Sequence, residues 1–99
     1  MAYRVEYSPE TEGHFRALTA AQRSLVLSTV ENQLTRQPTV EARNRKLMRP
    51  NLLATWELRI RNLRVYYAVE EAPEQTVLIR AVGIKTGNRV RIGGQEIEL

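Results

Sequence analysis

The chain has 99 residues, of which 42% are hydrophobic and 26% are charged, as in a globular domain spanning residues 1–99. It has no cysteine, which excludes disulfides and thiolate metal sites, and a single histidine, which excludes a multi-histidine zinc site. We therefore expect no metal and no other cofactor. The N-terminal residues form no apolar signal segment, and no apolar run reaches about 18 residues, so we predict a cytoplasmic protein.

The excess positive charge lies in the middle of the chain. The net charge is +4, but residues 36–64 contain eight basic and two acidic side chains and therefore carry +6. The rest of the chain carries −2. A basic segment on a slightly acidic body indicates a polyanion or an acidic protein as partner, and the alternative is a solubilising surface.

The first half of the chain predicts one strand and two helices. Residues 3–7 alternate as in a strand, and Ser8-Pro9 should then begin a helix, with serine as cap and proline in the first turn. The sequence TAAQ at 19–22 has the spacing of a capping box, so a second helix should begin near Ala20. It should end before Gln37-Pro38 because the residue before a proline avoids helical geometry.

The second half predicts a sheet. Residues 38–55 look irregular, residues 56–71 contain two alternating strands, and residues 76–85 form a strand that is apolar on both faces. Gly93-Gly94 then indicates a short terminal hairpin. The expected fold is α+β, in the order β-α-α-β-β-β plus this hairpin, with the helical hairpin on one face of a small antiparallel-rich sheet.

Alternation within residues 56–71 assigns side chains to the two faces of this sheet. One set should face the helices: Trp56, Leu58, Ile60, Val65, Tyr67 and Val69. The other set should project from the opposite face, which nothing covers: Glu57, Arg59, Arg61, Arg64 and Tyr66. Alternation in the next strand turns Arg80 toward the helices, which indicates either a bulge or a position at the rim of the sheet with an ion-pair partner.

The segment KLMRPNLLATWELRIRNLRVYYAVEE…TVLIRAVGIK, residues 46–85, resembles the RelE/ParE superfamily of bacterial toxins, and the likeness extends over nearly the whole chain. The resemblance implies the toxin of a type II toxin–antitoxin module that a cognate antitoxin silences. RelE-like members are ribosome-dependent endoribonucleases that cut mRNA, whereas ParE-like members act on DNA gyrase and lack the nuclease residues. A third possibility is a non-toxic relative that only binds an antitoxin.

The resemblance also implies catalytic residues. Arg59 and Arg64 match basic positions that act on the phosphate, and Lys85 matches an arginine that acts as an electrostatic stabiliser or acid. Glu57 replaces a lysine, and it would serve either as the general base or in an exposed cross-strand ion pair. Arg91 or a neighbour stands where the family has a tyrosine.

Further residues are expected to bind RNA through their charge or, for Tyr66, by stacking on a base. This set comprises Arg43, Arg45, Lys46, Arg49, Arg61, Tyr66 and Arg91. Tyr66 has an equally simple interpretation as a good strand former. Trp56 is expected in the core, and His14 on the surface.

Overall fold

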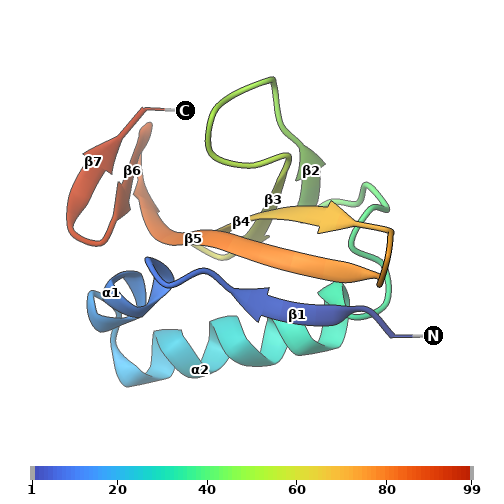
Figure 1. The fold of residues 1–99 in the computed structure, drawn as a ribbon. Helices are drawn as coiled ribbons and strands as arrows, with labels where there is room; N and C mark the ends of the chain where they lie inside the picture. The colour runs from blue at the N-terminus through green and yellow to red at the C-terminus, as the bar shows by residue number, and fades with distance from the viewer. Residues whose placement is uncertain (1, 99) are drawn as a thin grey trace.

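The structure, a computed structural model, describes residues 2–98 and consists of a sheet with two α-helices on one side (Figure 1). Its elements are β1 (Arg4–Tyr7), α1 (Thr11–Arg16), α2 (Ala20–Thr29), the π-helix η1 (Val30–Leu34), β2 (Arg45–Leu47), β3 (Trp56–Ile60), β4 (Leu63–Glu70), β5 (Thr76–Thr86), β6 (Arg89–Ile92) and β7 (Gln95–Ile97).

The capping box sets the start of α2. Thr19 Oγ1 accepts a hydrogen bond from the Gln22 amide at 3.1 Å, and Gln22 Oε1 accepts one from the Thr19 amide at 2.9 Å. The predicted start at Ala20 is confirmed. The expected cap of α1 is wrong, because that helix begins at Thr11 and Ser8 contributes its carbonyl oxygen, which accepts from Thr11 Oγ1 at 2.6 Å.

The strands form one sheet in the order β2-β3-β4-β5-β6-β7. These neighbours are antiparallel, and β1 joins as a parallel neighbour of β5, as the antiparallel-rich prediction requires. The long strand β5 pairs with β1 along its first half and with β6 along its second half. Strand β2 lies in the segment that was predicted to be irregular, because its three residues are too short for a visible alternation.

The face of the sheet toward the helices carries the main core. The predicted set is confirmed: Trp56, Leu58, Ile60, Val65 and Tyr67 are buried there, and the partly buried Val69 packs against them. The rings of Trp56 and Tyr67 are stacked with their centroids 6.2 Å apart, and the Tyr67 hydroxyl donates to the carbonyl oxygen of Pro38 at 2.6 Å. That bond joins β4 to the segment that follows the helices.

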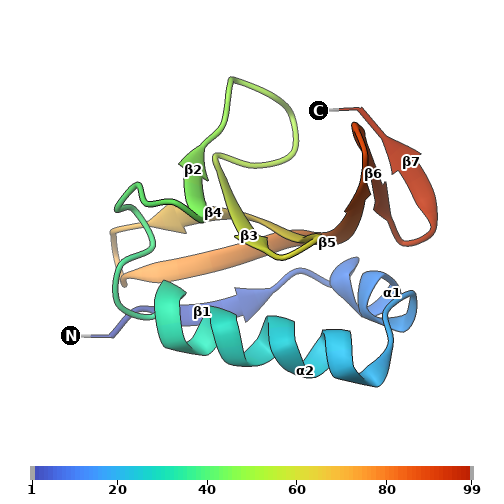
Figure 2. The same ribbon diagram turned by 180° about the vertical axis from the view of Figure 1, so that it is seen from behind.

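The opposite face is not open, which corrects the sequence-based prediction. Tyr66, Ala81 and Ile92 form a second core, and Met48, Leu53, Ala54, Val90 and Ile97 pack against it. Figure 2 shows why: the loop between β2 and β3 and the β6–β7 hairpin both rise on the side of the sheet away from the helices. The loop and the hairpin supply this cover, because the described helices lie on the other side of the sheet.

A bulge in β5 explains the position of Arg80. Tyr66 pairs with Ala81 while Tyr67 pairs with Ile79, which leaves Arg80 as an extra residue with an exposed side chain. Of the two alternatives for Arg80, the bulge is confirmed. The extra residue allows Ile79 and Val82 to reach the same core although they are three positions apart.

Two adjacent buried tyrosines provide a matched stability test. Replacing Tyr67 with phenylalanine removes the bond to Pro38, so we expect the free energy of unfolding to fall by about 1–2 kcal/mol. Among the described residues the Tyr66 hydroxyl is buried without a hydrogen-bond partner, so Tyr66→Phe should leave the free energy of unfolding unchanged or raise it. Urea denaturation measures both, and equal losses in the two variants would contradict this difference.

Candidate active site

A polar cleft of about 560 Å³ lies on the face of the sheet away from the helices. Four of the predicted functional residues line it: Glu57, Arg59, Tyr66 and Lys85. The β6–β7 hairpin and the residues beside it form the other wall, with Asn88, Arg89, Val90, Glu96, Ile97 and Glu98. The cleft therefore contains side chains from three neighbouring sheet strands and the terminal hairpin.

Strand register brings these side chains to one face. Glu57 pairs with Tyr66 across β3 and β4, and Arg59 pairs with Arg64. Lys85 lies farther along β5, where its amide donates to the Asn62 carbonyl oxygen at 2.7 Å. The predicted convergence of Arg59 and Lys85 on one side of the sheet is thus present in the structure.

Glu57 and Arg59 form an ion pair that lines the cleft. The distance from Glu57 Oε1 to Arg59 Nε is 2.7 Å, and the side chains are 16% and 46% exposed, respectively. Among residues 2–98 the two Nη groups of Arg59 make no hydrogen bond, so they remain able to donate to an anion. A partly covered carboxylate therefore lies next to a guanidinium that is half open to solvent.

Tyr66 is the cross-strand neighbour of Glu57 and is fully buried. Its ring cannot stack on a base as the sequence suggested, because the second core encloses it. Burial and then the charge of Glu57 raise the pKa of Tyr66 well above its ordinary value. The hydroxyl stays protonated, and within the described part of the chain it donates no hydrogen bond.

Arg64 does not line the cleft, although its strand position is on the same face. The side chain is 9% exposed, and its Nη1 donates to the carbonyl oxygens of Arg61 at 2.8 Å and Leu63 at 2.9 Å. Arg61 lies in the β3–β4 turn with a φ of 55°, and not on a strand face. The expectation that both arginines project from an open strand face is therefore wrong. Arg64 braces the turn in which Arg61 adopts left-handed geometry.

A second hollow of about 480 Å³ lies along the loop between β2 and β3. Glu57 and Arg59 belong to both hollows, and Lys46 and Arg49 line this one. The ion pair thus separates two adjoining depressions on one side of the sheet. Two predicted RNA-binding residues lie beside the candidate active site in this way.

The remaining predicted RNA-binding arginines lie apart from the cleft. Arg45 is buried and structural, because its Nη1 donates to Gln33 Oε1 at 2.6 Å and its Nε to the Val40 carbonyl oxygen at 3.0 Å. Arg43 is exposed on the loop before β2. Arg91 is exposed on β6 and does not line the cleft.

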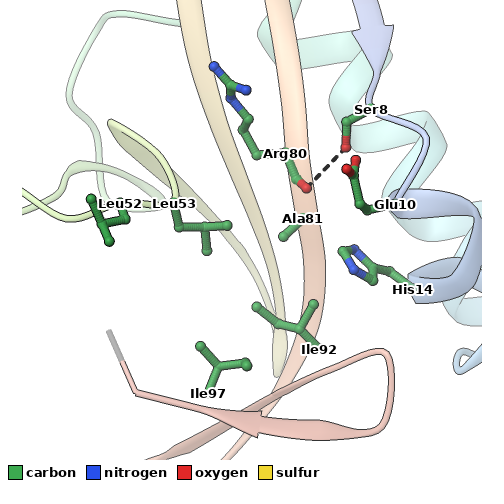
Figure 3. Close-up of a pocket in the computed structure, with 9 residues that line it drawn as sticks. All are labelled: Ser8, Glu10, His14, Leu52, Leu53, Arg80, Ala81, Ile92 and Ile97. Atoms are coloured by element: carbon green, nitrogen blue, oxygen red, sulfur yellow. Dashed lines mark hydrogen bonds between the residues drawn. The ribbon is translucent and has the colours of Figure 1, made fainter.

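A separate, mostly apolar pocket of about 390 Å³ lies near α1 and the β5 bulge. Figure 3 shows Ser8, Glu10 and His14 on one side of β5 and Leu53 on the other, with Ile92 and Ile97 below. Ser8 Oγ donates to the Arg80 carbonyl oxygen at 3.2 Å, and His14 Nδ1 accepts from the Val82 amide at 3.3 Å. This half-buried histidine was predicted to be a surface residue.

Among residues 2–98, no group of three histidine, aspartate or glutamate side chains could hold a metal ion. None of the helices in this part of the chain is long and apolar enough to span a membrane.

Comparison with known proteins gives a structural likeness and no sequence match. Neither the protein-family models nor the curated proteins provide a match to this sequence. A chain of the toxin–antitoxin complex RelBE2 from Mycobacterium tuberculosis superimposes with a TM-score of 0.73 at 22% sequence identity. The alignment covers 86% of this chain and 100% of that chain. The likeness confirms the predicted α+β, RelE-like fold.

His14 makes stability depend on pH, because only the neutral imidazole can accept the Val82 amide. Burial lowers the pKa of His14 below 6.5, so as the pH falls the unfolded chain binds the proton first. This contribution is complete above 6.5 and should be lost as the pH falls through the lowered pKa. Denaturation midpoints of the wild type and His14→Gln, measured across this range, should therefore converge as the pH falls; a constant difference would contradict the prediction.

Proposed function

We propose that this protein is the toxin of a type II toxin–antitoxin module and acts as a ribosome-dependent mRNA endoribonuclease. The observation that carries the proposal is the cleft in which Glu57, Arg59 and Lys85 meet. The shared fold with a chain of a toxin–antitoxin complex supports the module. A carboxylate and two cations in one cleft are suited to RNA cleavage, which needs a base and positive charge at the phosphate.

In the proposed reaction the RNA supplies its own nucleophile. The Glu57 carboxylate removes the proton of a 2′-hydroxyl, and the 2′-oxygen forms a bond to the adjacent phosphorus. The bond from phosphorus to the 5′-oxygen breaks, and Lys85 gives that oxygen a proton. The products are a 2′,3′-cyclic phosphate and a 5′-hydroxyl, and the excess proton on Glu57 returns to Lys85 through solvent.

Arg59 stabilises the charge that develops on the phosphate. Its Nε holds Glu57 at 2.7 Å, and its Nη groups can donate to the non-bridging oxygens. Arg64 does not contact the RNA in this reaction. It holds the β3–β4 turn next to its strand partner Arg59. The buried Tyr66, the cross-strand neighbour of Glu57, forms part of the lining of the cleft.

The exposed basic side chains outside the cleft would hold the RNA backbone. Lys46 and Arg49 border the adjoining hollow, and Arg43 lies on the preceding loop. Each phosphate that they neutralise makes RNA binding more dependent on salt. The same basic surface suits an acidic amphipathic segment of an antitoxin, which would silence the protein by covering the cleft.

A second candidate function is a ParE-like action on DNA gyrase, without nuclease chemistry. One observation favours it: the cleft is lined by as many carboxylates as cations. Balanced charge is more usual where a surface meets another protein than where it binds a polyanion. Inducing the protein and following translation and DNA supercoiling separately would distinguish the two functions.

Substitutions in the cleft test the nuclease. In ribosomes programmed with mRNA, Arg59→Ala should slow cleavage about 100-fold or more, because it removes charge stabilisation from the transition state. Glu57→Gln should slow cleavage about 100-fold while ribosome binding persists, because the amide cannot accept the 2′-proton. Primer extension on the mRNA measures both.

Arg16→Ala is the matched control, since Arg16 is an exposed arginine on α1 and lies outside the cleft. It should leave cleavage unchanged. Full cleavage by Glu57→Gln would remove Glu57 from the role of base. If induction of the protein changes DNA supercoiling while mRNA stays intact, the gyrase alternative is favoured.

A further inference from the structure

The terminal strand β7 brings negative charge into the cleft. The cleft is lined by three basic residues, Arg59, Lys85 and Arg89, and by three acidic ones, Glu57, Glu96 and Glu98. Glu57 is already paired with Arg59, so the two other carboxylates offset the remaining cations. Both come from β7 or the residue after it. Without them the same cleft would have a net charge of +2.

Glu96 is in contact with one of these cations. Its Oε1 lies 3.5 Å from Arg89 Nη1, and both side chains are substantially exposed. Because both charges are hydrated, the pair is weak and can be exchanged for another anion at little cost. A phosphate is such an anion, and it would compete with these carboxylates for the cations of the cleft.

The attachment of β7 to the sheet is slight. The strand has three residues and pairs with β6 alone among the described strands, through Val90–Ile97, Arg91–Glu96 and Ile92–Gln95. Ile97 is the partly buried side chain that anchors it to the second core. Displacing β7 would break one short edge pairing and one apolar contact and would leave the rest of the sheet intact.

The turn before β7 is built from two glycines with left-handed geometry. Gly93 has a φ of 61° and Gly94 a φ of 83°. Gly93 is close to His14, because a Cβ there would lie 3.2 Å from His14 Cδ2, whereas nothing lies within 4 Å of a Cβ at Gly94. The path of the turn depends on both glycines, because side-chain-bearing residues rarely adopt this geometry.

We propose that β7 is an acidic strap that forms part of the wall of the cleft in the free protein and is displaced when RNA phosphates bind. This inference rests on the proposed function, because it assumes that the cleft binds RNA. Glu96 and Glu98 then act as an internal competitor for the phosphate. They weaken the binding of any polyanion to the cleft. RNA that also contacts Lys46 and Arg49 has the additional binding energy needed to displace them.

The strap is tested by removing its charge. The double variant Glu96→Gln/Glu98→Gln keeps the size of both side chains and should bind a short single-stranded RNA about five- to tenfold more tightly than the wild type at low salt. The control Glu31→Gln/Glu70→Gln changes the net charge equally at two exposed residues outside the cleft, and it should bind with wild-type affinity. Fluorescence anisotropy of the labelled RNA measures all affinities.

Arg59→Ala separates failure of the strap from failure of the proposed function. If Arg59→Ala weakens RNA binding and the strap variant binds more tightly than its control, the proposal is supported. If Arg59→Ala weakens binding but the strap and control variants bind alike, the strap is wrong and the RNA-binding cleft stands. If Arg59→Ala binds RNA as the wild type does, both are overturned.

Discussion

Burial of both faces of β4 and β5 is the constraint on which the rest of the structure depends. Five successive residues of β4, Leu63–Tyr67, are buried, although their side chains alternate between the two sides of the sheet. The helices cover one side, so the other must be covered by the loop between β2 and β3 and by the β6–β7 hairpin. The hairpin forms one wall of the cleft, and the loop lines the adjoining hollow. The need to cover the second face of β4 and β5 therefore also creates the candidate active site.

The sequence predicted the elements and the core facing the helices better than it predicted exposure on the other face. Alternation and capping are local signals, and they placed α2, the strand pair and the Gly93-Gly94 hairpin correctly. The cover over Tyr66 arises from segments distant in sequence whose apolar residues show no clear period. No local pattern could have indicated that Tyr66 would be enclosed.

The candidate site was predictable in part for the same reason. Strand parity brought Glu57, Arg59 and Lys85 to one face, as observed. Charge alone could not separate these residues from Arg45 and Arg64, whose guanidinium groups bind backbone carbonyls and a glutamine side chain. An arginine that braces a turn has the same sequence signature as one that binds phosphate. The count of basic residues therefore overestimates the charge available to a ligand.

The bulge at Arg80 changes which residues of β5 face the helices. Odd-numbered residues face them before the bulge, and even-numbered residues face them after it. Before it Val77 and Ile79 face the helices, and after it Val82 does so while Ala81 enters the second core. An unbulged β5 in the same pairing with β4 would carry the Lys85 ammonium group to the helical side of the sheet. A single inserted residue thus determines which face of the sheet carries Lys85. The cleft contains this cation because the backbone of β5 is bulged.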